Sequence, residues 1–134
     1  MDISFEELKA SACTGYTSYS GIELTSAGDG TAEGKIKIGS EHLNPSGAVH
    51  GGVSFCLGDV LGGVAFRTMG GLPVTVSSNI TYFRPLINTE TVYGKAEVIR
   101  FGKTTAFVEV QIFNDKMTEC CRIAATYYNM KDRV

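Results

Sequence analysis

The segment from Asn44 to Ala65, NPSGAVHGGVSFCLGDVLGGVA, combines residue types that acyl transfer requires. It reads as a polar loop followed by a helix that begins with Gly51 and Gly52, whose bare backbone N–H groups would lie at the positive end of the helix. Donors in that place can hold an oxyanion. Asp59 is the only acidic residue of the segment and supplies a carboxylate for general-base or nucleophilic work.

Gly51 and Asp59 are too far apart to serve one substrate from a single helix. Eight positions separate them in the sequence, which corresponds to about 12 Å along a helix axis. A reacting carboxylate must lie within about 3–3.5 Å of the atom it attacks, or one water away. Two antiparallel copies would bring Gly51 of one chain opposite Asp59 of the other. We therefore predict a homodimer with two composite sites.

Three glycines inside this helix, Gly58, Gly62 and Gly63, indicate close packing, because each costs about 1 kcal/mol relative to alanine. The residues expected to form its buried stripe recur at three- and four-residue steps: Val53, Leu57, Val60, Leu61 and Val64. A different face carries Gly58, Asp59, Gly62 and Phe66, and we interpret it as a contact for a second subunit or an acyl chain. The alternative is that the glycines let the helix lie against a sheet.

Size and composition favour one globular domain over residues 1–134. The formal net charge of −2 at pH 7 argues against a nucleic-acid partner. No apolar run reaches the 18 or more residues of a membrane span, and the acidic N-terminus is unlike a secretory signal. These features predict a cytoplasmic protein without a membrane partner. Four cysteines without metal-ligand spacing predict reduced thiols and no metal site.

Hydrophobic periodicity and turn signals indicate the elements that position the central helix. The expected elements are, in chain order, a short helix at 3–12, strands at 16–27 and 31–38, the central helix at 50–68, and strands at 74–82, 92–98, 106–112 and 121–127. The tight spacing of the last four strands predicts an antiparallel meander. The pattern therefore predicts an α+β domain in which a curved antiparallel sheet wraps around one long helix.

The chain resembles the hotdog-fold thioesterases, specifically the phenylacetic-acid-degradation type within the 4-hydroxybenzoyl-CoA thioesterase superfamily. The residues that carry the resemblance are Asn44, Gly47, the triplet at 50–52 (HGG), Asp59, and the runs at 79–85 (NITYFRP) and 101–107 (FGKTTAF). An HGG triplet with an asparagine six residues before its histidine and an aspartate nine after it is more specific than the triplet alone. The resemblance covers about residues 30–128 and implies a single hotdog domain.

The resemblance implies hydrolysis of acyl-CoA thioesters, with aryl or medium- to long-chain acyl groups, without a metal or other cofactor. It also implies homodimers whose helices lie side by side and which often pair into tetramers. The backbone N–H of Gly51 would then polarise the thioester carbonyl, with Asn44 or His50 assisting or orienting water. Asp59 of the neighbouring subunit would act as general base, or as nucleophile through a transient anhydride.

Further residues follow from the same resemblance. Thr75 occupies a position where this family often has a Ser or Thr that helps to place the attacking water, and Ser77 is the alternative. The predicted substrate-binding residues are Gly52, Ser77, Ser78, Arg84 and Lys103. Arg84 and Lys103 follow strand ends where the phosphates of CoA could lie, although ordinary surface charge explains them equally well. Other candidates, for which surface charge is the better explanation, are Lys95, Arg100 and Arg122.

Several assignments have a structural alternative. His50 could be an acid or simply a helix cap, and Asn44 could be only the turn residue before Pro45. Cys56 is interpreted as a packing residue, because no histidine is placed to activate it. The aromatic residues that could line an acyl pocket or fill the core are Phe55, Phe66, Tyr82 and Phe83. A hydratase would need a His/Asp or His/Glu pair that the two histidines do not supply, whereas a non-catalytic acyl-CoA sensor on the same fold stays open.

Overall fold

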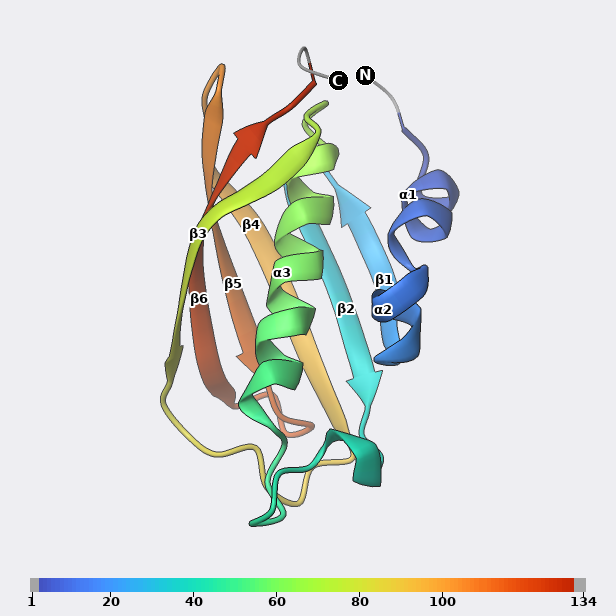
Figure 1. Cartoon of the computed structure of the whole chain (residues 1–134), viewed down its shortest axis with the longest axis vertical. Coiled ribbons are helices and arrows are strands. Elements are labelled where there is room, and N and C mark those ends of the chain that lie inside the picture. The colour runs from blue at the N-terminus through green and yellow to red at the C-terminus, as the bar shows by residue number, and fades with distance from the viewer. Residues whose placement is uncertain (1–2, 132–134) are drawn as a thin grey trace.

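The computed structural model describes residues 3–131 as a six-stranded sheet that curves around one long helix, with two short helices beside it (Figure 1). The elements are α1 (Phe5–Ala12), α2 (Gly15–Tyr19), β1 (Ile22–Gly28), β2 (Thr31–Lys37), the 3-10 turn η1 (Ser40–His42), α3 (Gly51–Arg67), β3 (Pro73–Tyr82), β4 (Thr91–Phe101), β5 (Thr105–Phe113) and β6 (Glu119–Asn129). The predicted α+β class and the central helix are confirmed. Among the described residues, no helix is long and apolar enough to cross a membrane.

The sheet is antiparallel throughout, in the order β1-β2-β4-β5-β6-β3. The predicted meander is therefore right for β4, β5 and β6 and wrong for β3, which pairs with β6 instead of β4. The segment at 83–90 carries the chain across one end of the sheet, so that β3 lies at its outer edge (Figure 1). Local alternation of residues cannot distinguish these two pairings, because both place the same side chains toward the helix.

The segment expected as a strand from residue 16 begins as helix α2 and becomes β1 only at Ile22. Tyr16 and Tyr19 have high strand propensity, but both lie exposed, at 71% and 87%. The chain turns into the sheet at Gly21, whose φ of 81° is a left-handed conformation that glycine adopts easily. The strand prediction therefore failed because propensity alone cannot fix where a chain reverses.

Helix α3 packs onto the concave face of the sheet by its aliphatic residues. Leu57, Leu61 and Val64 are 0%, 0% and 2% exposed, as the predicted stripe requires, whereas Val53 and Val60 are only half-buried. Burying each such side chain contributes about 1.5–3 kcal/mol. This packing fixes the helix that carries the candidate site.

Two of the interior glycines face the sheet, which corrects our interpretation of them as a subunit or ligand contact. A Cβ atom at Gly58 would overlap the side chain of Ile123, and one at Gly62 would lie 2.5 Å from the hydroxyl of Tyr127. Both partners belong to β6, so the glycines let α3 approach that strand. Gly63 lies on another side of the helix, where it lines a groove together with Asp59.

Candidate active site

Two hollows lie along α3, one at its start and one near its middle. The first, which we call the amide cavity, has a volume of about 350 Å³ and is lined by residues that include Gly51, Tyr82, Phe83, Arg84, Leu86 and Cys121. The second, the carboxylate groove, has a volume of about 230 Å³ and is lined by residues that include Asp59, Gly63, Arg67, Pro73, Thr75 and Tyr127. Gly51 and Asp59 thus face separate spaces within one chain.

The backbone of Gly51 is held in place by a tyrosine from the end of β3. The Tyr82 hydroxyl donates a hydrogen bond to the Gly51 carbonyl at 2.8 Å. A Cβ atom at this glycine would lie 2.8 Å from the same hydroxyl, so a larger residue would displace the tyrosine. Within residues 3–131 the Gly51 N–H finds no acceptor. The amide is therefore available to a ligand in the amide cavity.

The N–H of Gly52 is not bare, contrary to our expectation of two free amides. It donates to Nδ1 of His50 at 2.9 Å, and His50 is the N-cap residue of α3. Within the chain, the Nδ1 atom of His50 therefore caps the helix, which is the structural alternative that we considered for this residue. Its other ring nitrogen, on an exposed side chain, is not needed for this cap.

Asn44 uses its side-chain carbonyl to shape the loop before α3. The Oδ1 atom accepts hydrogen bonds from Ser46 N at 3.0 Å, from Ser46 Oγ at 2.9 Å and from Ala48 N at 3.1 Å. Such bonds stabilise a tight turn after an asparagine. Asn44 also lines the amide cavity. With its oxygen occupied, the group that it can offer to a ligand there is the side-chain NH₂, a donor.

Asp59 lies where α3, β3 and β6 meet. Its Oδ1 accepts a hydrogen bond from Thr75 Oγ1 at 2.9 Å. The Tyr127 hydroxyl donates to the backbone carbonyl of Asp59 at 3.0 Å and lies 3.5 Å from Oδ1. Burial raises the pKa of Tyr127 and the Asp59 charge raises it further, so this hydroxyl keeps its proton. The carboxylate is thus held by one oxygen, an arrangement that leaves the other for proton transfer.

The register of β3 separates Thr75 from its alternative, Ser77. Thr75 pairs with Tyr127, whose side chain is buried against α3, and a bulge then shifts the strand so that Ser77 pairs with Thr126. Directly paired side chains lie on the same face of a sheet, so Thr75 faces the helix while Ser77 faces away. Ser78 faces the helix as well, and its buried hydroxyl has no partner within residues 3–131.

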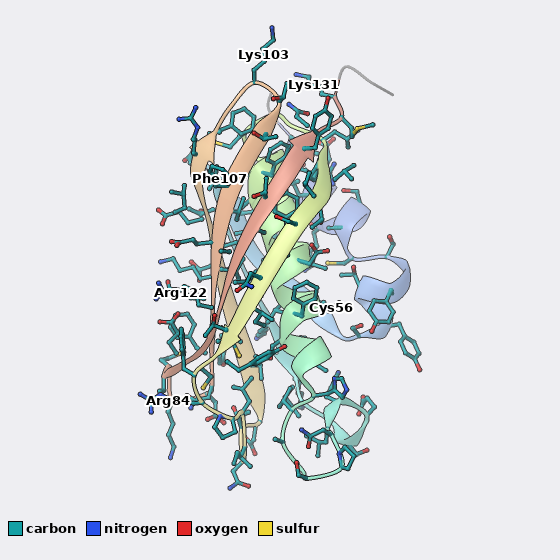
Figure 2. All side chains as sticks on the ribbon, turned by 60° about the vertical axis from the view of Figure 1, so that its left-hand side comes forward. Cys56, Arg84, Lys103, Phe107, Arg122 and Lys131 are labelled. Carbon is teal, nitrogen blue, oxygen red and sulfur yellow. The ribbon has the colours of Figure 1, made fainter. Side chains whose placement is uncertain are left out.

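Arg84 and Lys103 lie at opposite ends of the molecule (Figure 2). Arg84 lines the amide cavity, as Gly51 does. Lys103 is exposed in the turn between β4 and β5 and lines neither hollow. Of these two basic residues, therefore, only Arg84 lines one of the two hollows of a single chain.

Cys56 lies half-buried on α3 (Figure 2). Burial raises the pKa of its thiol, and the nearby Asp59 carboxylate raises it further. A thiol with a raised pKa is a poor nucleophile at neutral pH. This agrees with our interpretation of Cys56 as a packing residue.

Two contacts of the site were not predicted from the sequence, and both come from tyrosine hydroxyls. Tyr82 was considered only as a residue that lines a pocket, and Tyr127 only as part of a strand. Tyr127 is 68 positions from Asp59 and Tyr82 is 31 positions from Gly51. No local pattern marks a pair so far apart in sequence, although interior Gly62 was an indirect signal that a side chain comes close there.

Both the sequence and the fold of this chain match known proteins. A family model described as the thioesterase superfamily matches residues 46–121. The chain is 38% identical over 95 residues to acyl-coenzyme A thioesterase 13 of Homo sapiens, which covers 69% of this chain and 68% of that protein. The structure is similar to zebra fish thioesterase superfamily member 2, with a TM-score of 0.86, 25% identity, and coverage of 96% of this chain and 99% of that chain.

A hypothetical thioesterase of Streptococcus pneumoniae, solved with coenzyme A, is also similar. Its TM-score is 0.76 at 28% identity, with coverage of 81% of this chain and 87% of that chain. The same protein was solved as two single alanine variants, one of an aspartate and one of a threonine 16 positions later.

Proposed function

The chain belongs to the thioesterase superfamily, and from this premise we propose that it is an acyl-CoA thioesterase whose active site is completed by two chains. Membership confirms the predicted hotdog fold and the predicted enzyme class, a thioester hydrolase. The proposal adds the roles of individual residues. The observation that carries it is that the Gly51 amide and the Asp59 carboxylate, both suited to this chemistry, face separate hollows of one chain.

The pair formed by Asp59 and Thr75 is supported as the reacting end of the site. Their side chains meet at 2.9 Å across 16 positions of sequence. The aspartate and threonine that were replaced in the Streptococcus pneumoniae protein have the same separation. We propose that Asp59 takes the proton of the attacking water, or attacks the carbonyl itself, and that Thr75 orients the carboxylate and the water.

The edge strand β3 supports a second copy of this chain as the partner. It pairs with β6 on one side only, so its other side presents unpaired backbone groups. Val74 and Val76 on this strand are 49% and 59% exposed. Exposed apolar side chains at a sheet edge are typical of a surface that a partner covers. A two-fold axis at this edge would place two α3 helices side by side and antiparallel, with Gly51 of one opposite Asp59 of the other. Pairing of such dimers into tetramers stays a further proposal.

In the proposed reaction, the thioester carbonyl accepts a hydrogen bond from the Gly51 N–H. This bond strengthens as negative charge develops on the oxygen, so it lowers the barrier rather than only binding the substrate. Water adds to the carbonyl carbon and gives its proton to Asp59, the carbon–sulfur bond then breaks, and the CoA sulfur leaves with that proton. Asn44 contributes its side-chain NH₂ as a second donor, and His50 holds the amides in position.

The remaining predicted residues concern the CoA and acyl parts of the substrate. Arg84 beside the amide cavity suits the phosphates of CoA, and a CoA complex is known for the Streptococcus pneumoniae protein. Lys103 would have to reach the nucleotide of a substrate bound by another subunit, as would Ser77 on the outer face of β3. We propose that Gly52 and Ser78 line the path of the acyl group, which is an aryl or a medium- to long-chain acyl group.

Mixed dimers test the two-chain proposal directly. An Asp59→Asn chain and a Gly51→Val chain are each expected to be inactive, because each homodimer lacks one half of both sites. After unfolding and refolding of an equal mixture, half of the dimers would carry one intact site. Release of free CoA thiol should then return to about a quarter of the wild-type rate. No recovery in dimers shown to be mixed would contradict the composite site.

The substrate class is tested by thiol release from a panel of aryl and straight-chain acyl-CoAs. Turnover of at least one of them is expected. Tight binding of acyl-CoA without any turnover would instead support the sensor function and overturn the proposed hydrolase.

A further inference from the structure

Tyr127 is a buried tyrosine whose hydroxyl reaches the main chain of the proposed base. Its side chain is 2% exposed, and its ring packs against Phe66 with the centroids 6.1 Å apart. The hydroxyl donates to the Asp59 carbonyl at 3.0 Å and lies 3.5 Å from Oδ1 of the same residue. A buried phenol needs such a partner, and it has found one on the residue that the proposed mechanism uses most.

The sequence of α3 makes room for this contact. A Cβ atom at Gly62 would lie 2.5 Å from the Tyr127 oxygen, and 3.2 Å from two of its ring carbons. Any other residue at this position would therefore push the hydroxyl away from Asp59. Glycine in a helix interior is unfavourable relative to alanine, so its presence here indicates that the tyrosine must come close.

Thr75 and Tyr127 lie opposite each other in the β3–β6 pair and approach Asp59 together. The threonine binds Oδ1 at 2.9 Å, while the tyrosine fixes the backbone from which the carboxylate extends. The Asp59 residue is then held both at its carboxylate and at its backbone, which limits rotation of the side chain. Because Tyr127 keeps its proton, it acts as a donor to Asp59 throughout the neutral pH range.

We propose that Tyr127, admitted by Gly62, is a positioning residue that holds Asp59 in the orientation required for thioester hydrolysis. The proposal rests on the proposed function, because it assumes that Asp59 is the reacting carboxylate. Small displacements of a reacting group have large effects on rate, since a misplacement of about 1 Å can cost about 100-fold. In this role the tyrosine, which also lines the carboxylate groove, acts through Asp59.

Tyr127→Phe removes the hydroxyl and leaves the ring in the core. We expect kcat to fall on the order of tenfold while KM for the best acyl-CoA changes less than about threefold, because one hydrogen bond to the base is lost and substrate contacts are not. Tyr93→Phe is the matched control and should keep the wild-type kcat. Tyr93 lies on β4 between Val92 and Gly94, which face α3, so its own side chain points away from the site.

Thermal unfolding of the same variants separates positioning from a purely structural role. If Tyr127 only stabilised the fold, Tyr127→Phe would lower the melting temperature, and kcat measured well below that temperature would equal that of Tyr93→Phe. This result would overturn the proposal. A raised KM with unchanged kcat would overturn it as well, because it would indicate a substrate contact.

The Gly62→Ala variant is an independent test of the proposal, because it leaves Tyr127 in place. The added methyl group should displace the hydroxyl and lower kcat at least as much as Tyr127→Phe, with KM again little changed. In the double variant the clash is reduced, so the two losses should not multiply. Multiplying losses would contradict the proposal. Wild-type protein without thioesterase activity would contradict the proposed function itself, whereas an active wild type with an unaffected Tyr127→Phe variant would contradict this inference alone.

Discussion

The two hollows along α3 are built in different ways. The amide cavity takes its key group, the Gly51 N–H, from a helix start that neighbouring residues shape: His50 caps the helix and Asn44 forms the turn before it. The carboxylate groove takes its key group, Asp59, from the middle of the helix, where residues of β3 and β6 hold it. Neighbouring residues thus shape the helix end that carries the donor, with one tertiary contact from Tyr82, whereas the side chain on the helix face is fixed by tertiary partners alone.

This difference predicts how substitutions act at the two places. Changes at the groove should remove chemistry and leave the fold intact, because side chains do the work there. Changes at the amide cavity should act through the backbone, and part of their effect should appear as lost stability. The four predictions below test this contrast.

Asp59→Asn should have the largest effect. The amide keeps the size of the side chain but cannot accept the proton, so we expect turnover to fall by about 10³-fold or more, with acyl-CoA affinity within a few-fold of wild type. Steady-state kinetics and equilibrium binding measure the two quantities. Asp29→Asn is a suitable control, because Asp29 lies in the β1–β2 turn with a φ of 51°, which asparagine tolerates. Near-normal turnover of Asp59→Asn would remove this residue from the mechanism.

Gly51→Ala should have the next largest effect. Its Cβ atom would lie 2.8 Å from the Tyr82 hydroxyl and displace it, so the amide would shift from its position. Loss of one oxyanion donor typically costs about 10²–10³-fold in rate, and we expect a fall near 10²-fold because the N–H itself remains. Gly28→Ala, at a position where a Cβ atom meets nothing within 4 Å, serves as the control. Equal rates for both variants would mean that the amide is not used.

Thr75 should show an intermediate effect that depends on its hydroxyl alone. Thr75→Val keeps the shape and loses the donor to Asp59, for which we expect about a tenfold fall in kcat. Thr75→Ser keeps the donor and should retain most of the activity. If Thr75→Ser were as slow as Thr75→Val, the methyl group rather than the hydroxyl would be the important feature.

His50 should have the smallest effect on chemistry and a measurable one on stability. Loss of the cap in His50→Ala should cost about 1 kcal/mol of unfolding free energy, which lowers the melting temperature by roughly 4 °C for a domain of this size. His50→Asn restores a good cap and should recover both stability and activity. A stable but inactive His50→Asn variant would show instead that the imidazole transfers a proton.

The same contrast explains which features were predictable. The central helix, its cap and the loop before it follow from neighbouring residues, and so does the alternation of the strands. The position of β3 does not, because its side chains would face the helix equally well beside β4 or beside β6. The glycines at 58 and 62 were assigned to the wrong contact for a similar reason: periodicity shows that a face is special but not what lies against it.

The sequence by itself determined a helix that begins with glycine at position 51 and carries a carboxylate at Asp59, at a separation that no single helix can bridge. This followed because helix geometry is fixed per residue and needs no knowledge of the rest of the chain. Only the tertiary structure decided which hydroxyls hold that carboxylate. Thr75 and Tyr127 reach it through strand pairing and through a bulge that sets the register. Contacts across 16 and 68 positions depend on how distant segments pack, and local patterns carry no record of that packing.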